Sequence, residues 1–267
     1  MRDCDSEHRH GPTVLALTVL LALFSVQAEA QGSSRLDAIL KRGFIRVGTT
    51  GDYRPFTYFT PAGAYEGFDI DAAEKLGKAL GVEVRFVKTT WNELSEGILE
   101  DRYDIAMSGI TRTLSRLTRV GLTDSYLKIG KSALIRAADK GRFRTLADID
   151  QPEVRIGVNP GGTNESFLRA NIQRAQIVVI PDNLAIPDAL ATGKVDVMVT
   201  DNIEAILVAQ ERPDLFAVAP DRTFTKEDVA YMVPRDDQPF INWLNLWIHR
   251  MKVTGEIQAL KENWIGK

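Results

Sequence analysis

Two carboxylates in one short segment are the strongest candidates for acid–base chemistry in this sequence. The segment reads Thr200-Asp201-Asn202-Ile203-Glu204 and follows an apolar stretch. In one interpretation Asp201 caps a helix, and Glu204, three residues later, completes a capping box. In the other, both carboxylates face a cleft, where a glutamic acid can protonate a leaving group. Residue types alone favour the cap and leave both interpretations open.

A second segment carries groups that are suited to binding a carboxylate. Residues 108–116 read SGITRTLSR, with Ser108, Gly109 and Thr111 at a turn and Arg116 about one helical turn further on. Arginine presents a planar fork that matches the two oxygens of a carboxylate. A surface arginine after an ordinary turn would give the same pattern, so this segment needs support from others.

A third segment, NPGGTNE at 159–165, offers mainly backbone groups. Glycines such as Gly162 let the backbone approach a ligand closely. Thr163 is placed to cap the helix that follows, and the free N–H groups at a helix start attract anions. The alternative is an ordinary turn with its cap.

Aromatic side chains occur in the segment GDYRPF at 51–56, where Gly51 and Pro55 predict a turn. Tyr53 and Phe56 either form the aromatic wall of a cleft or pack inside a domain.

The first thirty residues differ in character from the rest of the chain. An almost unbroken apolar run covers 12–26, and Ala28-Glu29-Ala30 has the small-x-small pattern of a signal cleavage site. The run is shorter than the roughly 20 residues that a membrane-spanning helix needs. We predict a signal peptide at 1–30, a periplasmic location and no stable membrane insertion, with an uncleaved anchor as the alternative.

Removal of this segment restricts the available chemistry. The mature chain would have no cysteine and one histidine, His249, which lies in an amphipathic segment and is expected to be structural. Disulfides, thiol catalysis and Cys/His metal sites are therefore excluded. The formal net charge of −3 offers no basic footprint for nucleic acid. Any catalysis must come from carboxylates, lysine, tyrosine, hydroxyls or backbone amides.

Short apolar strands alternate with amphipathic helices along the rest of the chain. Strands are predicted at 44–49, 82–88, 104–109, 154–158, 176–180 and 195–200, and helices at 69–80, 239–254 and 256–264. This alternation is typical of α/β proteins, whose parallel or mixed sheets are flanked by helices. In such sheets ligands bind beyond the carboxyl ends of the strands, where the polar segments above fall.

The strand–helix rhythm runs twice, which predicts two lobes. Lobe 1 is expected at 31–135 plus 224–267 and lobe 2 at 136–223. Two extended segments, 131–137 and 229–234, are expected to pair as the crossover strands of a hinge. A cleft between two such lobes is a preferred ligand site.

Taken together, GTTGDYRPFTY, YEGFDIDAAEKLGKALG, YDIAMSGITRTLSR and VNPGGTNESF resemble the periplasmic solute-binding proteins for polar amino acids. The resemblance covers nearly the whole mature chain. It implies a type II periplasmic-binding-protein fold, with two α/β lobes that close on a two-strand hinge. It also implies that Arg116, Thr111 and Thr163 clamp a ligand carboxylate and that Asp201 receives an α-amino group. The binding set that it implies also includes Asp52, Tyr53, Ser108, Gly109 and Gly162.

Within that family, the sequence is most similar to the cyclohexadienyl dehydratases. Trp91, Lys131, Asn159 and Glu204 fall on their characteristic active-site positions, whereas the amino-acid binders usually have other residues at positions 131 and 204. The resemblance implies prephenate or arogenate as the substrate and phenylpyruvate or phenylalanine as the product. One departure lies in Asp124-Ser125-Tyr126, which lacks the proline of most relatives and bears on the loop that leads to Lys131.

The implied mechanism is a decarboxylating dehydration that needs no cofactor. Glu204 would protonate the departing hydroxyl, Asn159 would fix that hydroxyl and Trp91 would wall the ring. Lys131 would either hydrogen-bond the hydroxyl or orient Glu204. The alternative function is that of an amino-acid receptor for an ABC transporter, without catalysis. Self-association into a homo-oligomer is compatible with the sequence, which does not specify it.

Overall fold

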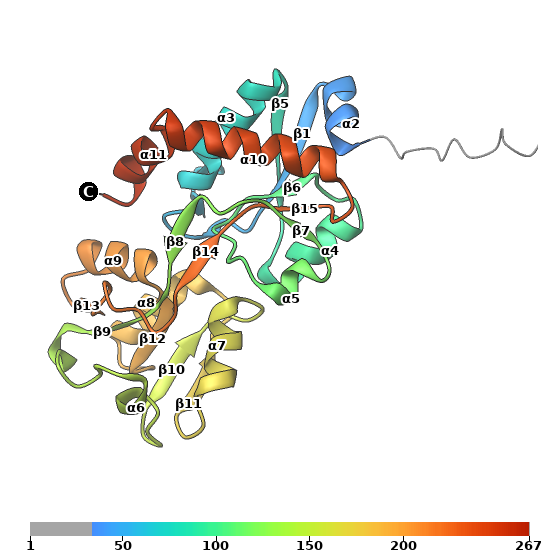
Figure 1. Ribbon diagram of the computed structural model, residues 1–267. Helices are drawn as coiled ribbons and strands as arrows, with labels where there is room; N and C mark the ends of the chain where they lie inside the picture. The colour runs from blue at the N-terminus through green and yellow to red at the C-terminus, as the bar shows by residue number, and fades with distance from the viewer. Residues whose placement is uncertain (1–33, 267) are drawn as a thin grey trace, which may run out of the picture. The chain divides into compact units, whose positions relative to one another are not determined.

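The computed structural model describes residues 34–266, so the predicted signal peptide, Cys4, His8 and His10 lie outside the described residues. These residues form two lobes, each built on a five-stranded sheet (Figure 1). Within this range, no helix combines the length and apolar character that crossing a membrane requires.

The lobe 1 sheet has the strand order β5-β1-β6-β15-β7, and β1 is parallel to both β5 and β6. β15 runs antiparallel between β6 and β7, so the sheet is mixed. A separate antiparallel sheet of β2, β3 and β4 follows β1. The strands are β1 (Phe44–Thr49), β2 (Asp52–Tyr53), β3 (Thr57–Phe59), β4 (Tyr65–Glu66), β5 (Glu83–Lys88), β6 (Ile105–Ala106), β7 (Gly121–Leu122) and β15 (Met232–Val233).

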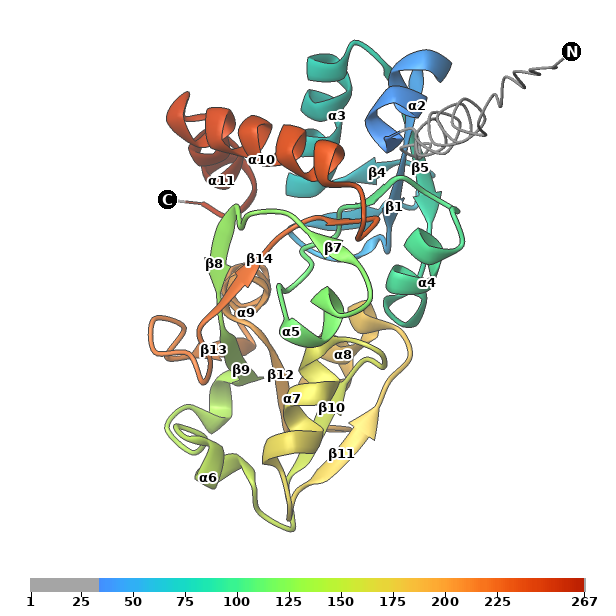
Figure 2. The same cartoon turned by 45° about the vertical axis from the view of Figure 1, so that its right-hand side comes forward.

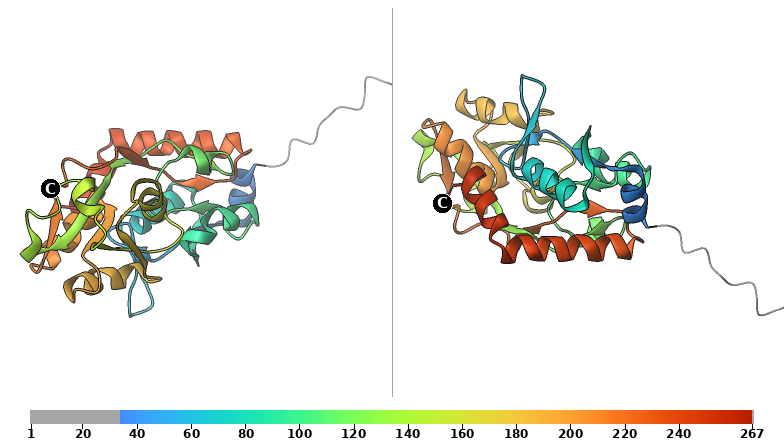
Figure 3. Two further views of the ribbon diagram at one scale, coloured as in Figure 1. Left: turned by 90° about the horizontal axis from the view of Figure 1, so that it is seen from below. Right: turned by 90° about the horizontal axis from the view of Figure 1, so that it is seen from above.

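Helices flank the lobe 1 sheet, and two of them, α2 and α3, stop at a glycine. α3 ends at Gly81, whose left-handed φ of 69° suits a residue without a Cβ. α10 runs along one side of the lobe in both views of Figure 3 and contacts α2 and α11. The helices are α2 (Arg35–Arg42), α3 (Phe68–Leu80), η1 (Trp91–Glu93), α4 (Leu94–Leu99), α5 (Leu114–Leu117), α10 (Gln238–Val253) and α11 (Glu256–Trp264).

The lobe 2 sheet repeats the plan with the order β11-β10-β12-β9-β13. β10 is parallel to β11 and β12, and β9 runs antiparallel between β12 and β13. The strands are β9 (Lys131–Arg136), β10 (Arg155–Val158), β11 (Gln176–Val179), β12 (Val197–Asp201) and β13 (Leu215–Val218). The helices are η2 (Ala137–Asp139), α6 (Leu146–Ile149), α7 (Thr163–Asn171), η3 (Asn183–Ala185), α8 (Ile186–Ala191) and α9 (Asn202–Glu211).

The two-strand hinge exists, but it lies beside the predicted segments and overlaps them only at Val229. β8 (Leu127–Ile129) pairs antiparallel with β14 (Glu227–Val229), and this pair joins the lobes (Figure 2). The predicted hinge strands 131–137 and 229–234 do not pair with one another. Residues 131–136 form β9 in the middle of the lobe 2 sheet, and 232–233 form β15 in the lobe 1 sheet. Both predicted segments are apolar because they are interior strands of the two lobe sheets. The hinge strands β8 and β14 are shorter and lie next to them in the sequence.

Each lobe has its own apolar core. The lobe 1 core includes Phe56, Phe68 and Tyr231, and the lobe 2 core includes Phe143 and Val197. Lobes that are stabilised separately can move about the hinge as units.

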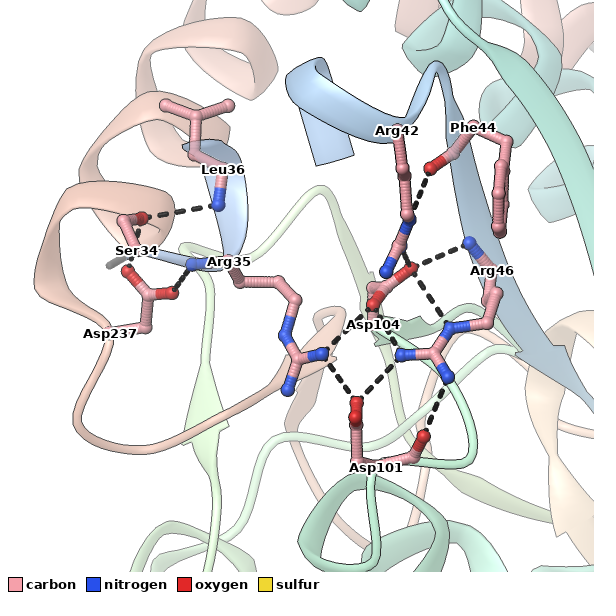
Figure 4. Close-up of polar contacts among 9 residues, drawn as sticks. All are labelled: Ser34, Arg35, Leu36, Arg42, Phe44, Arg46, Asp101, Asp104 and Asp237. Carbon is pink, nitrogen blue, oxygen red and sulfur yellow. Dashed lines mark hydrogen bonds and ion pairs between the residues drawn. The ribbon is translucent and has the colours of Figure 1, made fainter. Parts of the chain in front are cut away.

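A buried carboxylate fixes α2 and β1 at one end of lobe 1 (Figure 4). Asp104 is fully buried and accepts the Arg46 N–H at 2.7 Å. It also pairs with the guanidinium groups of Arg35, Arg42 and Arg46. Asp101 shares Arg35 and Arg46 but remains largely exposed. None of the residues in this cluster lines the cavity between the lobes. We therefore propose that the cluster stabilises the fold.

Candidate active site

Eight of the predicted residues line a small cavity of about 20 Å³ between the lobes. Lobe 1 contributes Tyr53, Trp91, Gly109 and Thr111, and lobe 2 contributes Asn159, Gly162, Thr163, Asn164, Asn183 and Asp201. The remaining predicted residues, Asp52, Ser108, Arg116, Lys131 and Glu204, do not line it. A larger groove of about 630 Å³ between α3 and α10 contains none of the predicted residues.

Direct contacts across the cleft explain why the enclosed space is so small. The Tyr53 hydroxyl donates to the Asp201 carboxylate, and the Thr111 and Thr163 hydroxyls lie 3.1 Å apart. The Arg54 guanidinium binds Glu211 of α9 through two hydrogen bonds of 2.7 Å. The lobes are closed on each other, so a ring-sized ligand enters only when they separate.

Glu204 is buried beside the cleft and is not part of a capping box. Asp201 is the N-cap of α9, but its side chain makes no capping hydrogen bond. Glu204 Oε1 accepts from Asn183 Nδ2 at 2.8 Å, and Oε2 accepts from the Thr200 hydroxyl. The capping interpretation of the pair is therefore wrong, because both carboxylates are engaged by cleft residues.

Burial raises the pKa of the Glu204 carboxyl to about 8. Hydrogen bonds from Thr200 and Asn183 oppose this rise, whereas the nearby carboxylates of Asp201 and Asp52 add to it. Burial also raises the pKa of Asp52. A Glu204 carboxyl with this pKa holds its proton at neutral pH and is able to act as a general acid.

Lys131 is fully buried and its ammonium is surrounded by oxygen atoms. Its Nζ lies 2.7 Å from Asp201 Oδ1, 2.9 Å from Thr163 Oγ1 and 3.3 Å from Glu227 Oε2. Glu227 belongs to the hinge strand β14. Lys131 thus connects the first residue of β9 with the end of β12, the start of α7 and the hinge.

Arg116 lies in α5 and is partly buried next to the cleft. Its Nη1 donates to the Thr111 main-chain oxygen at 2.7 Å. Burial lowers the pKa of the guanidinium to about 10, with Asp201 and Glu227 acting in the opposite direction. The side chain stays charged at neutral pH and keeps further N–H donors for an anion.

The backbone anion site at α7 differs in one detail from the prediction. Gly162 is the N-cap and Thr163 is the first helical residue, so Thr163 does not cap this helix. Its hydroxyl instead contacts Thr111 and Lys131. The Gly162 and Thr163 residues still line the cavity at a helix start, where unpaired N–H groups attract anions.

Two predicted binding residues use their polar groups within lobe 1. The Gly109 N–H donates to Asp69 Oδ2 at 2.5 Å, and the Ser108 hydroxyl lies 2.8 Å from that of Thr50. Gly109 lines the cavity with its backbone, whose φ of 63° and tight packing against Tyr53 leave no room for a Cβ. Ser108 supports the turn from behind.

Aromatic side chains wall one side of the cavity. The Tyr53 and Trp91 rings meet edge to face with centroids 5.5 Å apart, and Trp91 Nε1 donates to the Asp52 carboxylate at 3.0 Å. Phe56 stacks behind Tyr53 and is fully buried in the lobe 1 core. Of the two aromatic residues in the predicted turn, Tyr53 faces the cleft and Phe56 packs the lobe.

Sequence reasoning missed four polar residues of this region: Asn164, Asn183, Thr200 and Glu227. Asn164 and Asn183 line the cavity, Thr200 binds Glu204, and Glu227 faces Lys131. Thr200 lies in the segment with Asp201, and Asn183 ends the triplet Pro181-Asp182-Asn183, which itself resembles the dehydratases, whereas Glu227 lies in a segment with no motif. Among residues 34–266 no group of three or more histidine, cysteine or acidic side chains is arranged to hold a metal ion.

This chain belongs to family 3 of the bacterial extracellular solute-binding proteins, whose model matches residues 45–267. The predicted family and the two-lobed fold of mixed sheets are thereby confirmed. Members of this family bind small, amino-acid-like ligands, in agreement with a cavity lined by amides, hydroxyls and a carboxylate.

Within the family, the chain is 44% identical to a cyclohexadienyl dehydratase of Pseudomonas aeruginosa, over 96% of this chain and 94% of that protein. The crystal structure of an ancestral cyclohexadienyl dehydratase is 46% identical, covers 88% of this chain and 98% of its own, and has a TM-score of 0.57. An ancestral amino-acid-binding protein, a precursor of cyclohexadienyl dehydratase, is 34% identical over 87% of this chain and 100% of its own, with a TM-score of 0.81. The predicted resemblance to the dehydratases is confirmed.

Proposed function

We propose that this protein is a cyclohexadienyl dehydratase, which converts prephenate to phenylpyruvate and arogenate to phenylalanine. The observation that carries the proposal is Glu204, a buried carboxyl beside the interlobe cavity whose pKa is raised to about 8. The 44% identity to a dehydratase over nearly the whole chain supports the same activity. A solute receptor has no need of a proton donor at this place.

The proposed reaction requires an acid for one step only. Prephenate carries a ring carboxylate and a hydroxyl on opposite carbons of a cyclohexadiene. Glu204 donates its proton to the hydroxyl oxygen, and the C–O bond breaks with loss of water. The C–C bond to the carboxylate breaks as CO2 leaves, and its electron pair completes the aromatic ring. Protonation of a leaving group by a positioned acid is typically worth ~10²–10⁴-fold.

The other site residues bind and orient the substrate. Arg116, Thr111 and the Gly162 and Thr163 amides are proposed to hold the side-chain carboxylate, Asn159 the hydroxyl, and Trp91 and Tyr53 the ring. The ring carboxylate must depart as neutral CO2, so tight cationic contacts to it would stabilise the ground state and slow the reaction.

Two roles for Lys131 were open, and its contacts favour one of them. Its ammonium binds Asp201 and Thr163, whereas the Glu204 oxygens bind Asn183 and Thr200. We therefore propose that Lys131 binds Asp201 and hydrogen-bonds the hydroxyl of the bound substrate. It does not orient Glu204 directly.

The second candidate function is amino-acid binding without catalysis. The 34% identity to an ancestral amino-acid-binding protein favours it, because that relative shares the fold and lies on the same lineage. Incubation of the purified protein with prephenate, followed by detection of phenylpyruvate, separates the two. No turnover, together with thermal stabilisation by an amino acid, would reject the enzyme.

We also propose export to the periplasm through the signal peptide at 1–30, in keeping with membership in an extracellular family. Fractionation of cells that express the full chain, with N-terminal sequencing of the periplasmic product, tests the cleavage after Ala30. Size-exclusion chromatography with light scattering tests the oligomeric state.

A further inference from the structure

Asn183 joins the proposed acid to the opposite lobe. Its Nδ2 donates to Glu204 Oε1 at 2.8 Å and to the main-chain oxygen of Asp52 at 3.0 Å. Glu204 belongs to lobe 2, whereas Asp52 belongs to β2 of lobe 1. Asn183 itself lies in η3 of lobe 2, lines the cavity and is only 3% exposed.

The orientation of this amide is fixed by its partners. A main-chain carbonyl oxygen only accepts hydrogen bonds, so the nitrogen of the amide must face Asp52. The same NH2 group has a second hydrogen, which it gives to Glu204. The Asp52 residue is held in turn, because its carboxylate accepts from Trp91 Nε1. A continuous chain of contacts thus runs from Trp91 through Asp52 and Asn183 to Glu204.

We infer that Asn183 is a positioning residue that places Glu204 for proton transfer only when the lobes are closed. The contact to Asp52 exists only while lobe 1 and lobe 2 touch. When the lobes open, Asn183 loses this partner, and its contact to Glu204 is no longer held from lobe 1. Closure on a substrate therefore sets the acid at the same time as it excludes water. This inference rests on the proposed dehydratase function.

The inference predicts a change in pH dependence as well as in rate. The Asn183 N–H group stabilises the Glu204 carboxylate, so its removal raises the pKa of Glu204 further. The groups that face Glu204 are Thr200 on β12, Asn183 on η3, and the carboxylates of Asp201 and Asp52. The Tyr53 hydroxyl donates to Asp201, which is one of these groups.

The test compares Asn183→Leu, which keeps the branched shape and the number of side-chain heavy atoms but removes the polar ones, with Asn183→Ser, which is smaller and polar. We expect Asn183→Leu to lower kcat about 10- to 100-fold, with a smaller change in KM. The alkaline limb of the pH–rate profile should move to higher pH. Asn171→Leu is the control, because Asn171 is an exposed asparagine of the same lobe that binds only its own helix. Circular dichroism and thermal melting check that each variant is folded.

The outcomes separate this inference from the proposed function. If the unaltered protein does not turn over prephenate, the proposed function fails. If the unaltered protein is active and both folded Asn183 variants keep its kcat and pH profile, Asn183 does not position the acid. Should Asn183→Leu fail to fold, Asn183→Ser decides, with the same two readouts.

Discussion

The Lys131 ammonium lies 2.7 Å from Asp201 Oδ1, and both side chains are almost completely buried. The other oxygen of Asp201 accepts from the Tyr53 hydroxyl. The carboxylate that would receive a ligand's ammonium group is therefore already occupied by groups of the protein itself. This occupancy distinguishes the site from one whose carboxylate has both oxygens free for a ligand ammonium group.

We predict that Lys131→Met gains affinity for amino acids while it loses dehydratase activity. Removal of the ammonium leaves a buried carboxylate without its partner, which typically costs about 3–5 kcal/mol of stability. A ligand ammonium can then take the vacated position. Thermal shift measurements with a panel of L-amino acids check this, with the exposed Lys128→Met as control. Equal stabilisation of both variants by every amino acid would contradict it.

Glu204→Gln is predicted to abolish most of the turnover and to retain substrate binding, because glutamine keeps the shape but has no acidic proton. Single-turnover kinetics with prephenate, together with calorimetric binding of a non-reactive analogue, measure the two effects separately. Full activity in this variant would remove Glu204 from the mechanism.

The pKa of Glu204 predicts that activity falls in alkali and that stability falls as pH rises from ~4.3 to about 8. The folded pKa of about 8 lies above that of an unfolded glutamate, ~4.3. The folded state therefore binds the proton more tightly, and the free energy of unfolding falls as pH rises between these values. kcat/KM should likewise fall as pH rises through about 8.

Asp69 is the control for this pH dependence, because burial raises its pKa to about 7. Urea unfolding from pH 5 to 9 should show a shallower loss of stability in Glu204→Gln than in the unaltered protein. Asp69→Asn should make the loss of stability shallower below about pH 7 and leave the loss between pH 7 and 8 unchanged. Identical curves for all three proteins would show that neither group titrates as stated.

Arg116→Ala is predicted to weaken binding of every carboxylate ligand. A charge-assisted pair with a carboxylate is worth about 1.5–3 kcal/mol, so KM for prephenate should rise at least tenfold. Arg119→Ala is the matched control, because Arg119 lies just beyond α5, is exposed and pairs with Glu96 on the surface. An unchanged KM in Arg116→Ala would refute the clamp.

Asp104→Ala should be far more destabilising than Asp101→Ala, although the two carboxylates share two arginines. Asp104 is fully buried with three partly buried guanidinium partners, so its loss leaves their positive charges uncompensated and should cost up to about 3–5 kcal/mol. Asp101 is 60% exposed, and its loss should cost about 0–1 kcal/mol. Urea denaturation measures both. Similar losses would mean that the cluster acts through surface charge alone.

Local patterns predicted most helices and strands, because the spacing of apolar residues along the chain reflects which side chains are buried. The run at 44–49 is β1 as expected, and the helix predicted at 69–80 begins one residue earlier. The strand predicted at 104–109 is shorter, since only 105–106 pair in the sheet and Gly109 turns the chain into the cleft. The hinge was misplaced because 131–136 is apolar for a different reason: it is an interior strand.

Sequence patterns predicted the site residues that lie in local motifs. They missed the residues whose partners are far away in the sequence. Asp201 and Glu204 are neighbours in sequence, yet their partners are Lys131 and Asn183, 70 and 21 residues away. Local reasoning therefore gave a capping box for a pair that serves the cleft. Asn183 begins the short helix η3, and its role depends on a carbonyl 131 residues away in the other lobe.

The place of β15 in the lobe 1 sheet has a consequence for the order of folding. This strand lies between β6 and β7, although more than a hundred residues separate it from them in the chain. All strands of the lobe 2 sheet lie within 131–218 and are synthesised before β15. Lobe 2 therefore has its complete sheet first. The lobe 1 sheet is complete only after β15 has been synthesised, and α10 follows it. A released chain truncated just before 232 should hold a protease-resistant second lobe attached to an unfinished first one.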